Sequence, residues 1–260
     1  MATLAIKDKL SPLITDTAQE LIHFASLENI LSWQDLVSTY KLLKDKHAAK
    51  KVLLLLEDIG QCEYTSMHAS MQDGLYFDET DNYPADSSEA DVHLENIRPL
   101  EVNYHIEQLL KLDNRVHFSE LFNKFTYNLH DFNKLIEINQ FPEKVLDKTI
   151  KVKLVDTSIE AHKFAAQLNG YFSCDLNPFE SFSLIRHLDE NYALEYIGLG
   201  ASLLFFIKSK ELSDNQINTL MQDLAQLYHF DEIVKEDLKQ VFLEKESLII
   251  PYSESLDVFM

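Results

Sequence analysis

The sequence predicts an α+β protein that is rich in helix, with a mainly helical region over residues 1–148 and an α+β domain over residues 149–260. Three observations lead to this fold class. Apolar residues recur with helical spacing through most of the first half, the spacing changes to alternation near residue 149, and strands mix with helices after that point. The second part is expected to hold a small sheet of about four strands.

The first sixty residues are expected to be helical. Ser11-Pro12 offers a cap followed by proline, and the apolar residues between Ile14 and Ala25 fall on one helical face. Ser32, with Asp35 three residues later, resembles a capping box and begins a second helix. The run KKVLLLLEDIG is ambiguous by periodicity alone, but its leucines and the Gly60 at its end favour a helix.

A window without lysine or arginine, residues 52–97, interrupts this pattern. It holds eleven acidic residues, while the rest of residues 1–148 holds 14 acidic and 14 basic residues. Pro84, Ser87 and Ser88 mark its middle as irregular, so a long acidic loop is expected near residues 61–97. Helical segments are expected again at 99–112, 118–139 and 142–147.

The alternating run TIKVKLV begins the second part at residue 149. Its apolar residues alternate with Lys151 and Lys153, which is the period of a half-buried strand with the two lysines facing outward. Thr157 and Glu160 then form a capping box for a helix that Asn169-Gly170 ends. The strand is therefore expected to be followed by a helix.

The remaining elements complete a β-αα-β-β-αα-β order. Asn177-Pro178 opens a helix, and the run ALEYIGLGASLLFFIK is expected to form two strands that fold at Gly198–Gly200. Ser213 with Gln216 caps the first of two further helices. The run SLIIPY closes the chain as a strand, and its proline places it at an edge or an end of the sheet.

The charge balance excludes several classes of partner. The formal net charge is −20, from 43 acidic and 23 basic residues, which opposes binding to nucleic acid and to anionic membrane surfaces. The first 30 residues have no apolar signal-peptide core, and only two cysteines occur, Cys62 and Cys174. We therefore expect a cytoplasmic protein that binds neither nucleic acid nor membranes.

No motif of a catalytic or cofactor site is present. Glycine occurs only five times, which disfavours phosphate-binding loops, and Gly198-Leu199-Gly200 is followed by an apolar strand rather than by a helix. Cys174 with His162 or His187 is a conceivable nucleophile and base, but a structural thiol is the favoured interpretation. We expect no catalytic residues and no cofactor.

The acidic loop has some spacing of a calcium site. Counting from Asp78, oxygen donors fall on five ligand positions, but Tyr83 stands where the sharp turn needs glycine. No metal is expected. Two alternatives then remain for the loop: a solvated spacer, or a docking surface in which aromatic residues supply contact area and acids orient a basic partner. The docking interpretation predicts these partner-binding residues: Asp73, Tyr76, Phe77, Asp78, Glu79, Asp81, Tyr83, Asp86, Glu89 and Asp91.

These features lead to one functional hypothesis and its alternatives. The favoured hypothesis is a non-enzymatic acidic protein that captures a basic protein partner. Its most specific form is an immunity or antitoxin-type protein that neutralises a cationic toxin such as a nuclease, because acids placed over a phosphate-binding cleft imitate nucleic-acid charge. The alternatives are a small-ligand-binding protein or enzyme with its site in the C-terminal α+β unit, and a regulatory scaffold.

Overall fold

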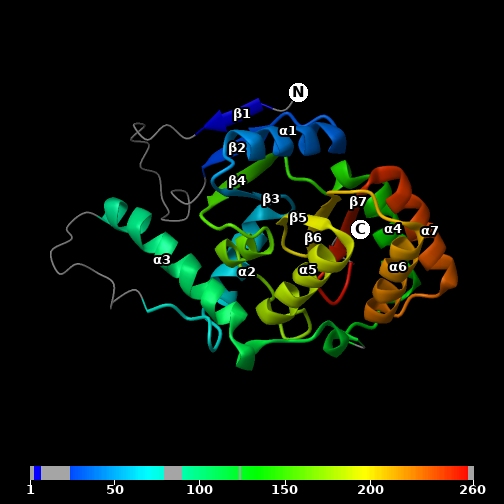
Figure 1. The fold of residues 1–260 in the computed structure, drawn as a ribbon. Helices are drawn as coiled ribbons and strands as arrows, with labels where there is room; N and C mark the ends of the chain where they lie inside the picture. Colours follow the sequence, from blue (N-terminus) through cyan, green and yellow to red (C-terminus); the bar gives the residue numbers. More distant parts are fainter. Residues whose placement is uncertain (1–2, 7–23, 79–89, 123, 257–260) are drawn as a thin grey trace.

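The computed structural model describes residues 3–6, 24–78, 90–122 and 124–256, with the side chains of 3–6 and 90–97 outside the description. It confirms the α+β class. The described residues contain one seven-stranded sheet (Figure 1), in the order β1-β2-β4-β3-β5-β6-β7. Its strands are β1 (Thr3–Ile6), β2 (Ala25–Glu28), β3 (Lys51–Leu55), β4 (Thr149–Val155), β5 (Leu194–Leu199), β6 (Leu203–Lys208) and β7 (Ser247–Pro251).

Neighbouring strands in this sheet are antiparallel except for β3 and β5, which run parallel. All the residues of β5 are buried, as are those of β6 except its last. Strands that are buried on both faces need cover on both faces, which explains their continuous apolar sequence. The described helices are α1 (Trp33–Lys46), α2 (Ile59–Ala69), α3 (Ala90–Leu110), α4 (Leu129–Gln140), α5 (Pro178–Tyr192), α6 (Asp214–Tyr228) and α7 (Glu232–Lys245). Of these, α1 packs on β3, α5 on β5, and α4 and α7 on β7.

Helices α4, α6 and α7 gather beside β7, whereas α3 extends away from the sheet (Figure 1). Four short 3-10 turns connect the described elements: η3 (Leu112–Asn114), η4 (Phe118–Leu121), η5 (Pro142–Lys144) and η6 (Ala161–Ala166). The edge of β7 is covered by one side chain of α4. The amide of Asn139 donates to the carbonyl oxygen of Ile249 and accepts from its N–H, each at 2.8 Å. Asn139 thereby takes the place of a neighbouring strand at this position.

The expected sheet of about four strands is wrong, because the N-terminal half contributes three strands to the same sheet. The leucine-rich run at 51–55, expected as a helix, is the central strand β3 between β4 and β5. Gly60 does not end a helix but lies in the first turn of α2, after Asp58 has capped it. Sequence periodicity failed here since a fully buried strand shows no alternation. The expected division into a region 1–148 and a domain 149–260 stays a prediction.

Other boundaries also differ from expectation. Most of the helix expected over residues 14–25 lies outside the described residues, and Ala25 begins β2. The loop expected near residues 61–97 is shorter, because α2 continues to Ala69 and α3 begins at Ala90. The segments expected as helical at 118–139 and 142–147 are the turn η4, the helix α4 and the turn η5.

Strand β4 also departs from the expected alternation. Lys153 is buried, and its ammonium group donates to the carbonyl oxygen of Ala166 at 2.9 Å and to the side-chain oxygen of Gln167 at 2.5 Å. The helix expected after Thr157 is only the 3-10 turn η6, and Glu160 makes no cap there. This turn covers the face of β4 that was expected to be exposed to solvent.

The local start signals of three helices are confirmed. Ser32 accepts from the backbone N–H of Asp35 at 3.2 Å, and Asn177 and Ser213 each form a complete capping box. Such bonds connect groups within three residues of each other, so they form whatever the rest of the chain does. The hairpin expected at Gly198–Gly200 is also present, between β5 and β6.

The two glycines of this hairpin allow close contact between neighbouring segments. A Cβ atom at Gly198 would lie 2.1 Å from the carbonyl oxygen of Leu54 in β3. A Cβ atom at Gly200 would lie 2.1 Å from the Glu57 carboxylate. The Gly-x-Gly pattern therefore serves the packing of the chain against itself.

Glu57 is buried behind this hairpin and gives a pH-dependent prediction. Burial raises the pKa of Glu57 to about 7, and Asp58 and Asp147 add to this, against the hydrogen bond from the backbone N–H of Ser202. Because the folded pKa exceeds the unfolded one, stability is greatest below pH 4.5 and falls as pH rises through 7. Between pH 5 and 8 the free energy of unfolding of the wild type should fall by about 2.5 kcal/mol relative to Glu57→Gln.

Urea unfolding of both proteins at pH 5 and pH 8 measures this difference directly. The glutamine keeps the shape of Glu57 and an acceptor for Ser202, so the comparison isolates ionisation. A constant difference between the two proteins across this pH range would contradict the expected titration of Glu57.

A second buried polar group joins α1, η6 and β5, and we call it the Lys163 cluster: Tyr40, Lys44, Glu160, Lys163 and Glu195. The Lys163 ammonium group is 0% exposed and donates to Tyr40 and to Glu160, each at 2.9 Å. Tyr40 in turn donates to Glu195 at 2.5 Å, and Lys44 donates to the same oxygen at 2.6 Å. The cluster fixes three elements that are far apart in sequence.

Candidate functional site

The predicted partner-binding residues are only partly described by the structure. Asp73, Tyr76 and Asp78 are exposed, and Phe77 is half-buried. Asp91 lies in α3, with its side chain outside the description. Five further residues lie outside the described part of the chain: Glu79, Asp81, Tyr83, Asp86 and Glu89. Their role in partner binding stays a prediction.

The segment from Gln72 to Asp78 is held against the body of the protein at several points. The Gln72 amide donates to the carbonyl oxygen of Gly170 at 3.1 Å. A ring nitrogen of the buried His105 lies 3.0 Å from the carbonyl oxygen of Leu75, and the Phe77 ring packs against Tyr104 at 5.5 Å between centroids. This middle part of the acidic window is thus anchored, and the Tyr76 side chain beside these contacts is 59% exposed.

An exposed aromatic surface lies next to this segment, and we call it the aromatic face: Tyr64, Met67, His68, Met71, Tyr171 and Phe172. Its rings form a continuous series, with centroid separations of 4.6 Å from Tyr64 to His68, 4.8 Å from His68 to Tyr171 and 5.3 Å from Tyr171 to Phe172. Tyr64 is 52% exposed and Phe172 is 47% exposed. Clustered exposed aromatic residues mark interaction surfaces more often than single ones do.

A tight turn at Gly170 comes directly before the exposed Tyr171 and Phe172. Gly170 has φ of +102°, and a Cβ atom there would lie 1.9 Å from the carbonyl oxygen of Leu176. The Asn169 amide donates to the carbonyl oxygen of Cys62 in α2 at 3.2 Å. This turn brings the loop beside α2 at a sequence distance of about a hundred residues.

Sequence reasoning missed the aromatic face because its two halves are far apart in the chain. Tyr64, Met67 and Met71 recur at helical spacing and resemble an ordinary apolar stripe. One local signal was available: Tyr171-Phe172 directly after an Asn-Gly turn, where two large aromatic residues are uncommon.

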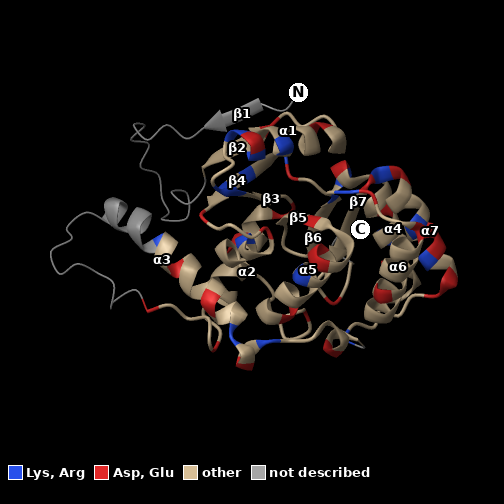
Figure 2. Ribbon diagram, viewed as in Figure 1, with Lys and Arg blue, Asp and Glu red and all other residues tan. Residues whose placement is uncertain are grey.

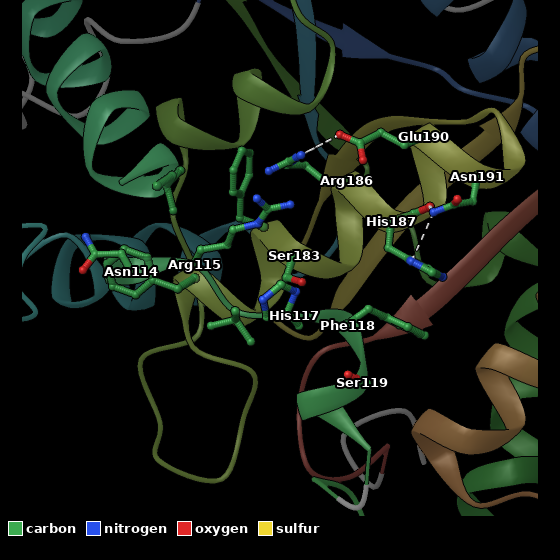
Figure 3. A pocket seen from close by; sticks show the side chains of 14 residues that line it. Asn114, Arg115, His117, Phe118, Ser119, Ser183, Arg186, His187, Glu190 and Asn191 are labelled. Carbon is green, nitrogen blue, oxygen red and sulfur yellow. Dashed lines mark hydrogen bonds and ion pairs between the residues drawn. The ribbon is translucent and has the colours of Figure 1, made fainter. Parts of the chain in front are cut away.

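A pocket lies between α5 and residues 109–119, and we call it the α5 pocket. Its cavity volume is 390 Å³. Three charged side chains line it, Arg115, Arg186 and Glu190, together with polar residues such as Ser119 and Ser183. Figure 3 shows the Arg115 side chain extending from its loop toward α5, where Arg186 and Glu190 are paired.

His187 forms one rigid wall of the α5 pocket. Its ring stacks on Phe118 with centroids 3.7 Å apart and planes 4° apart. Its Nε2 lies 2.7 Å from the carboxylate of Asp223, and the amide nitrogen of Asn191 lies 3.2 Å from its Nδ1. With the proton on Nε2, both ring nitrogens are engaged, so His187 positions the wall rather than offering a free base.

The thiol considered as a nucleophile lacks the environment of a reactive cysteine. Burial raises the pKa of the Cys174 thiol, and its hydrogen bond to Glu254 acts in the same direction. A reactive thiol instead needs a lowered pKa beside a positive group. His187 is engaged with Asp223, and the His162 ring faces Phe182 at 6.1 Å between centroids.

Within residues 24–78, 98–122 and 124–256, no group of three or more His, Cys, Asp or Glu side chains is arranged to hold a metal ion. None of the described helices is long and apolar enough to cross a membrane. Comparison of the chain with protein-family models, with curated proteins and with solved structures gave no match. Functional inference therefore rests on the geometry of these surfaces.

Proposed function

We propose that this chain is a non-enzymatic acidic protein of the cytoplasm that captures a basic protein partner. The observation that carries this proposal is the aromatic face, which lies exposed beside the anchored segment 72–78 of the acidic window. Aromatic side chains supply most of the binding energy at many interfaces, while acids around them orient a basic partner and speed its association.

The charge distribution supports a basic partner for this surface. Tyr64, Met67 and Met71 all belong to the window 52–97, which holds eleven acids and no lysine or arginine. The exposed Asp73 lies two residues after Met71. Figure 2 also shows acidic residues along α3, which packs against the segment from Gln72 to Asp78. A negative field of this kind attracts basic surfaces and repels nucleic acid.

The more specific form of the proposal is an immunity or antitoxin-type protein that covers the phosphate-binding cleft of a cationic toxin such as a nuclease. Acids at such a cleft would occupy the positions of nucleic-acid phosphates, and aromatic rings would occupy the positions of bases. If the captured partner is a nuclease, one equivalent of this protein should abolish its cleavage of DNA or RNA. Capture without inhibition would contradict this form and leave the general one standing.

Removal of the two loop aromatics tests the general proposal. We expect Tyr171→Ser with Phe172→Ser to weaken partner capture by about tenfold or more, because central aromatic contacts contribute about 2 kcal/mol or more each. Both side chains are exposed, so the fold should persist. The measurement is affinity capture from native lysate at low and high salt, with the captured proteins identified and their isoelectric points compared.

The matched control is Ile233→Ser with Leu243→Ser, which removes two exposed apolar side chains from α7. A second pair compares Asp73→Asn with Asp78→Asn against Glu232→Gln with Glu236→Gln on α7. The first acid pair should slow association several-fold at low salt, and the difference should disappear at high salt. Captured proteins with no basic bias, or equal losses at both surfaces, would contradict the proposal.

The alternative of a small-ligand protein or enzyme with its site in the C-terminal part is favoured by one observation, the α5 pocket, although only its α5 side belongs to residues 149–260. Its volume of 390 Å³ falls within the range of small-molecule sites. This pocket and the aromatic face consist of different residues, so the two functions are separable by substitution.

A further inference from the structure

We propose that the α5 pocket binds a small organic anion, with the carboxylate or phosphate group on Arg115 and an apolar part against the aromatic wall. This inference does not depend on the capture of a basic partner. The pocket offers positive charge to an anion, whereas the aromatic face lies among acids.

The charge inside the pocket is positive although the protein is strongly acidic. Arg186 forms two hydrogen bonds to one carboxylate oxygen of Glu190, at 3.0 and 2.7 Å, so the only acid among the described lining residues is already paired. The Arg115 guanidinium has no ion pair or side-chain hydrogen bond among the described residues. The Arg115 side chain is exposed to solvent and the Glu190 carboxylate is held by Arg186, so the Arg115 guanidinium is available to an external anion.

Hydrogen-bond donors accompany this positive charge. The hydroxyl groups of Ser119 and Ser183 line the pocket and have no hydrogen-bond partner among the described residues. Figure 3 shows both serines on the lining together with Arg115. Guanidinium and hydroxyl donors together match the oxygen atoms of a carboxylate or a phosphate.

The walls of the pocket are arranged before any ligand binds. The Arg186 guanidinium lies 5.9 Å from the centre of the Phe182 ring and is held by Glu190. Phe118 is stacked on His187, which Asp223 orients. Rigid walls reduce the ordering cost of binding, and their aromatic surface would contact an apolar part of the ligand.

The probes are benzoate and phenyl phosphate, which carry the two anionic groups on the same ring, with inorganic phosphate and the neutral benzyl alcohol as comparisons. Calorimetric titration should show saturable binding of benzoate or phenyl phosphate at concentrations up to about 10 mM. Whichever of the two binds more tightly identifies the ligand as a carboxylic acid or a phosphate ester. Binding should weaken at least tenfold in Arg115→Met, because the main positive contact is lost.

Lys111→Met is the matched control, since Lys111 is exposed, lies four residues before Arg115 and does not line the pocket. It makes the same change in net charge, and binding should change less than twofold. The proposal is overturned if neither aromatic anion binds saturably, or if benzyl alcohol binds as tightly as they do. It is also overturned if inorganic phosphate alone binds equally well, or if Arg115→Met and Lys111→Met have equal effects.

Discussion

Gly198→Ala should lower the free energy of unfolding by about 3 kcal/mol or more, because the added methyl group would overlap the backbone of a neighbouring strand. The new Cβ would lie 2.1 Å from the carbonyl oxygen of Leu54 and 2.8 Å from its carbonyl carbon. These are backbone atoms of the central strand β3, which cannot rotate aside as a side chain could. Gly198 and Leu54 are paired in the one parallel contact of the described sheet, so separating them disturbs its centre.

Gly60→Ala is the control for Gly198→Ala. Gly60 lies in α2, and a Cβ atom there would meet nothing within 4 Å. Alanine is preferred to glycine in a helix, so this change should stabilise the protein by about 0.5–1 kcal/mol. Denaturant unfolding of the three proteins measures both effects. If the two variants differ by less than about 1 kcal/mol, the close approach of β3 and β5 is not a constraint on stability.

Lys163→Met should lower the free energy of unfolding by about 3–5 kcal/mol, because it removes the buried cation of the cluster and leaves its acids with only the partly exposed Lys44 and Lys51. Burial opposes ionisation of Glu160, but Lys163, Lys51 and Lys44 outweigh it and lower its pKa to about 2. Burial also opposes the charged form of Lys163 and lowers its pKa, whereas Glu160 and Glu195 act to raise that pKa. Methionine replaces the apolar stem and lacks only the terminal atom, so the loss of stability reports mainly the charge and its hydrogen bonds.

Lys239→Met is the surface control for Lys163→Met. Lys239 lies 3.8 Å from Glu236, a pair whose two side chains are both partly exposed, and its loss should change stability by less than about 1 kcal/mol. A double variant, Lys163→Met with Glu195→Gln, should recover part of the loss, because it also removes one of the two acids near the lost cation. If Lys163→Met and Lys239→Met have equal effects, the buried cluster does not contribute to stability.

The two proposed sites divide the molecule by the sign of their charge. The aromatic face lies within and beside the acid-rich window, whereas the α5 pocket has an unpaired arginine in its lining. A basic partner therefore has no electrostatic reason to enter the pocket, and a small anion has none to approach the aromatic face. Variants at Arg115 and at Tyr171 should consequently affect one kind of binding each.

Parts of the fold that depend on neighbouring residues were predictable. The caps at Ser32, Asn177 and Ser213 and the hairpin at Gly198–Gly200 are bonds or turns within a few residues, so the sequence pattern carries them completely. Strand β3 was not predictable in the same way. Its five residues carry no period because both faces are buried, and only its position between β4 and β5 makes it a strand.

The candidate sites were also predictable only where they depend on neighbouring residues. Local composition identified the acidic window and the exposed Tyr76 within it. The partners of Tyr64 on the aromatic face come from residues 171 and 172, and the α5 pocket joins a loop near residue 115 with a helix near residue 186. Such pairings depend on chain folding over tens of residues, which a single sequence does not encode in any local pattern.

The amino-acid sequence by itself determined the net charge of −20, the acid-only window, the helix starts and the α+β class, because each follows from composition or from bonds between near neighbours. Other features depend on the tertiary structure: the burial of Lys153 and Lys163, the central place of β3, and the position of Arg115 in a pocket lining with no carboxylate paired to it among the described residues. A charged side chain is buried or exposed according to which distant segments pack over it, and that packing is a property of the whole fold.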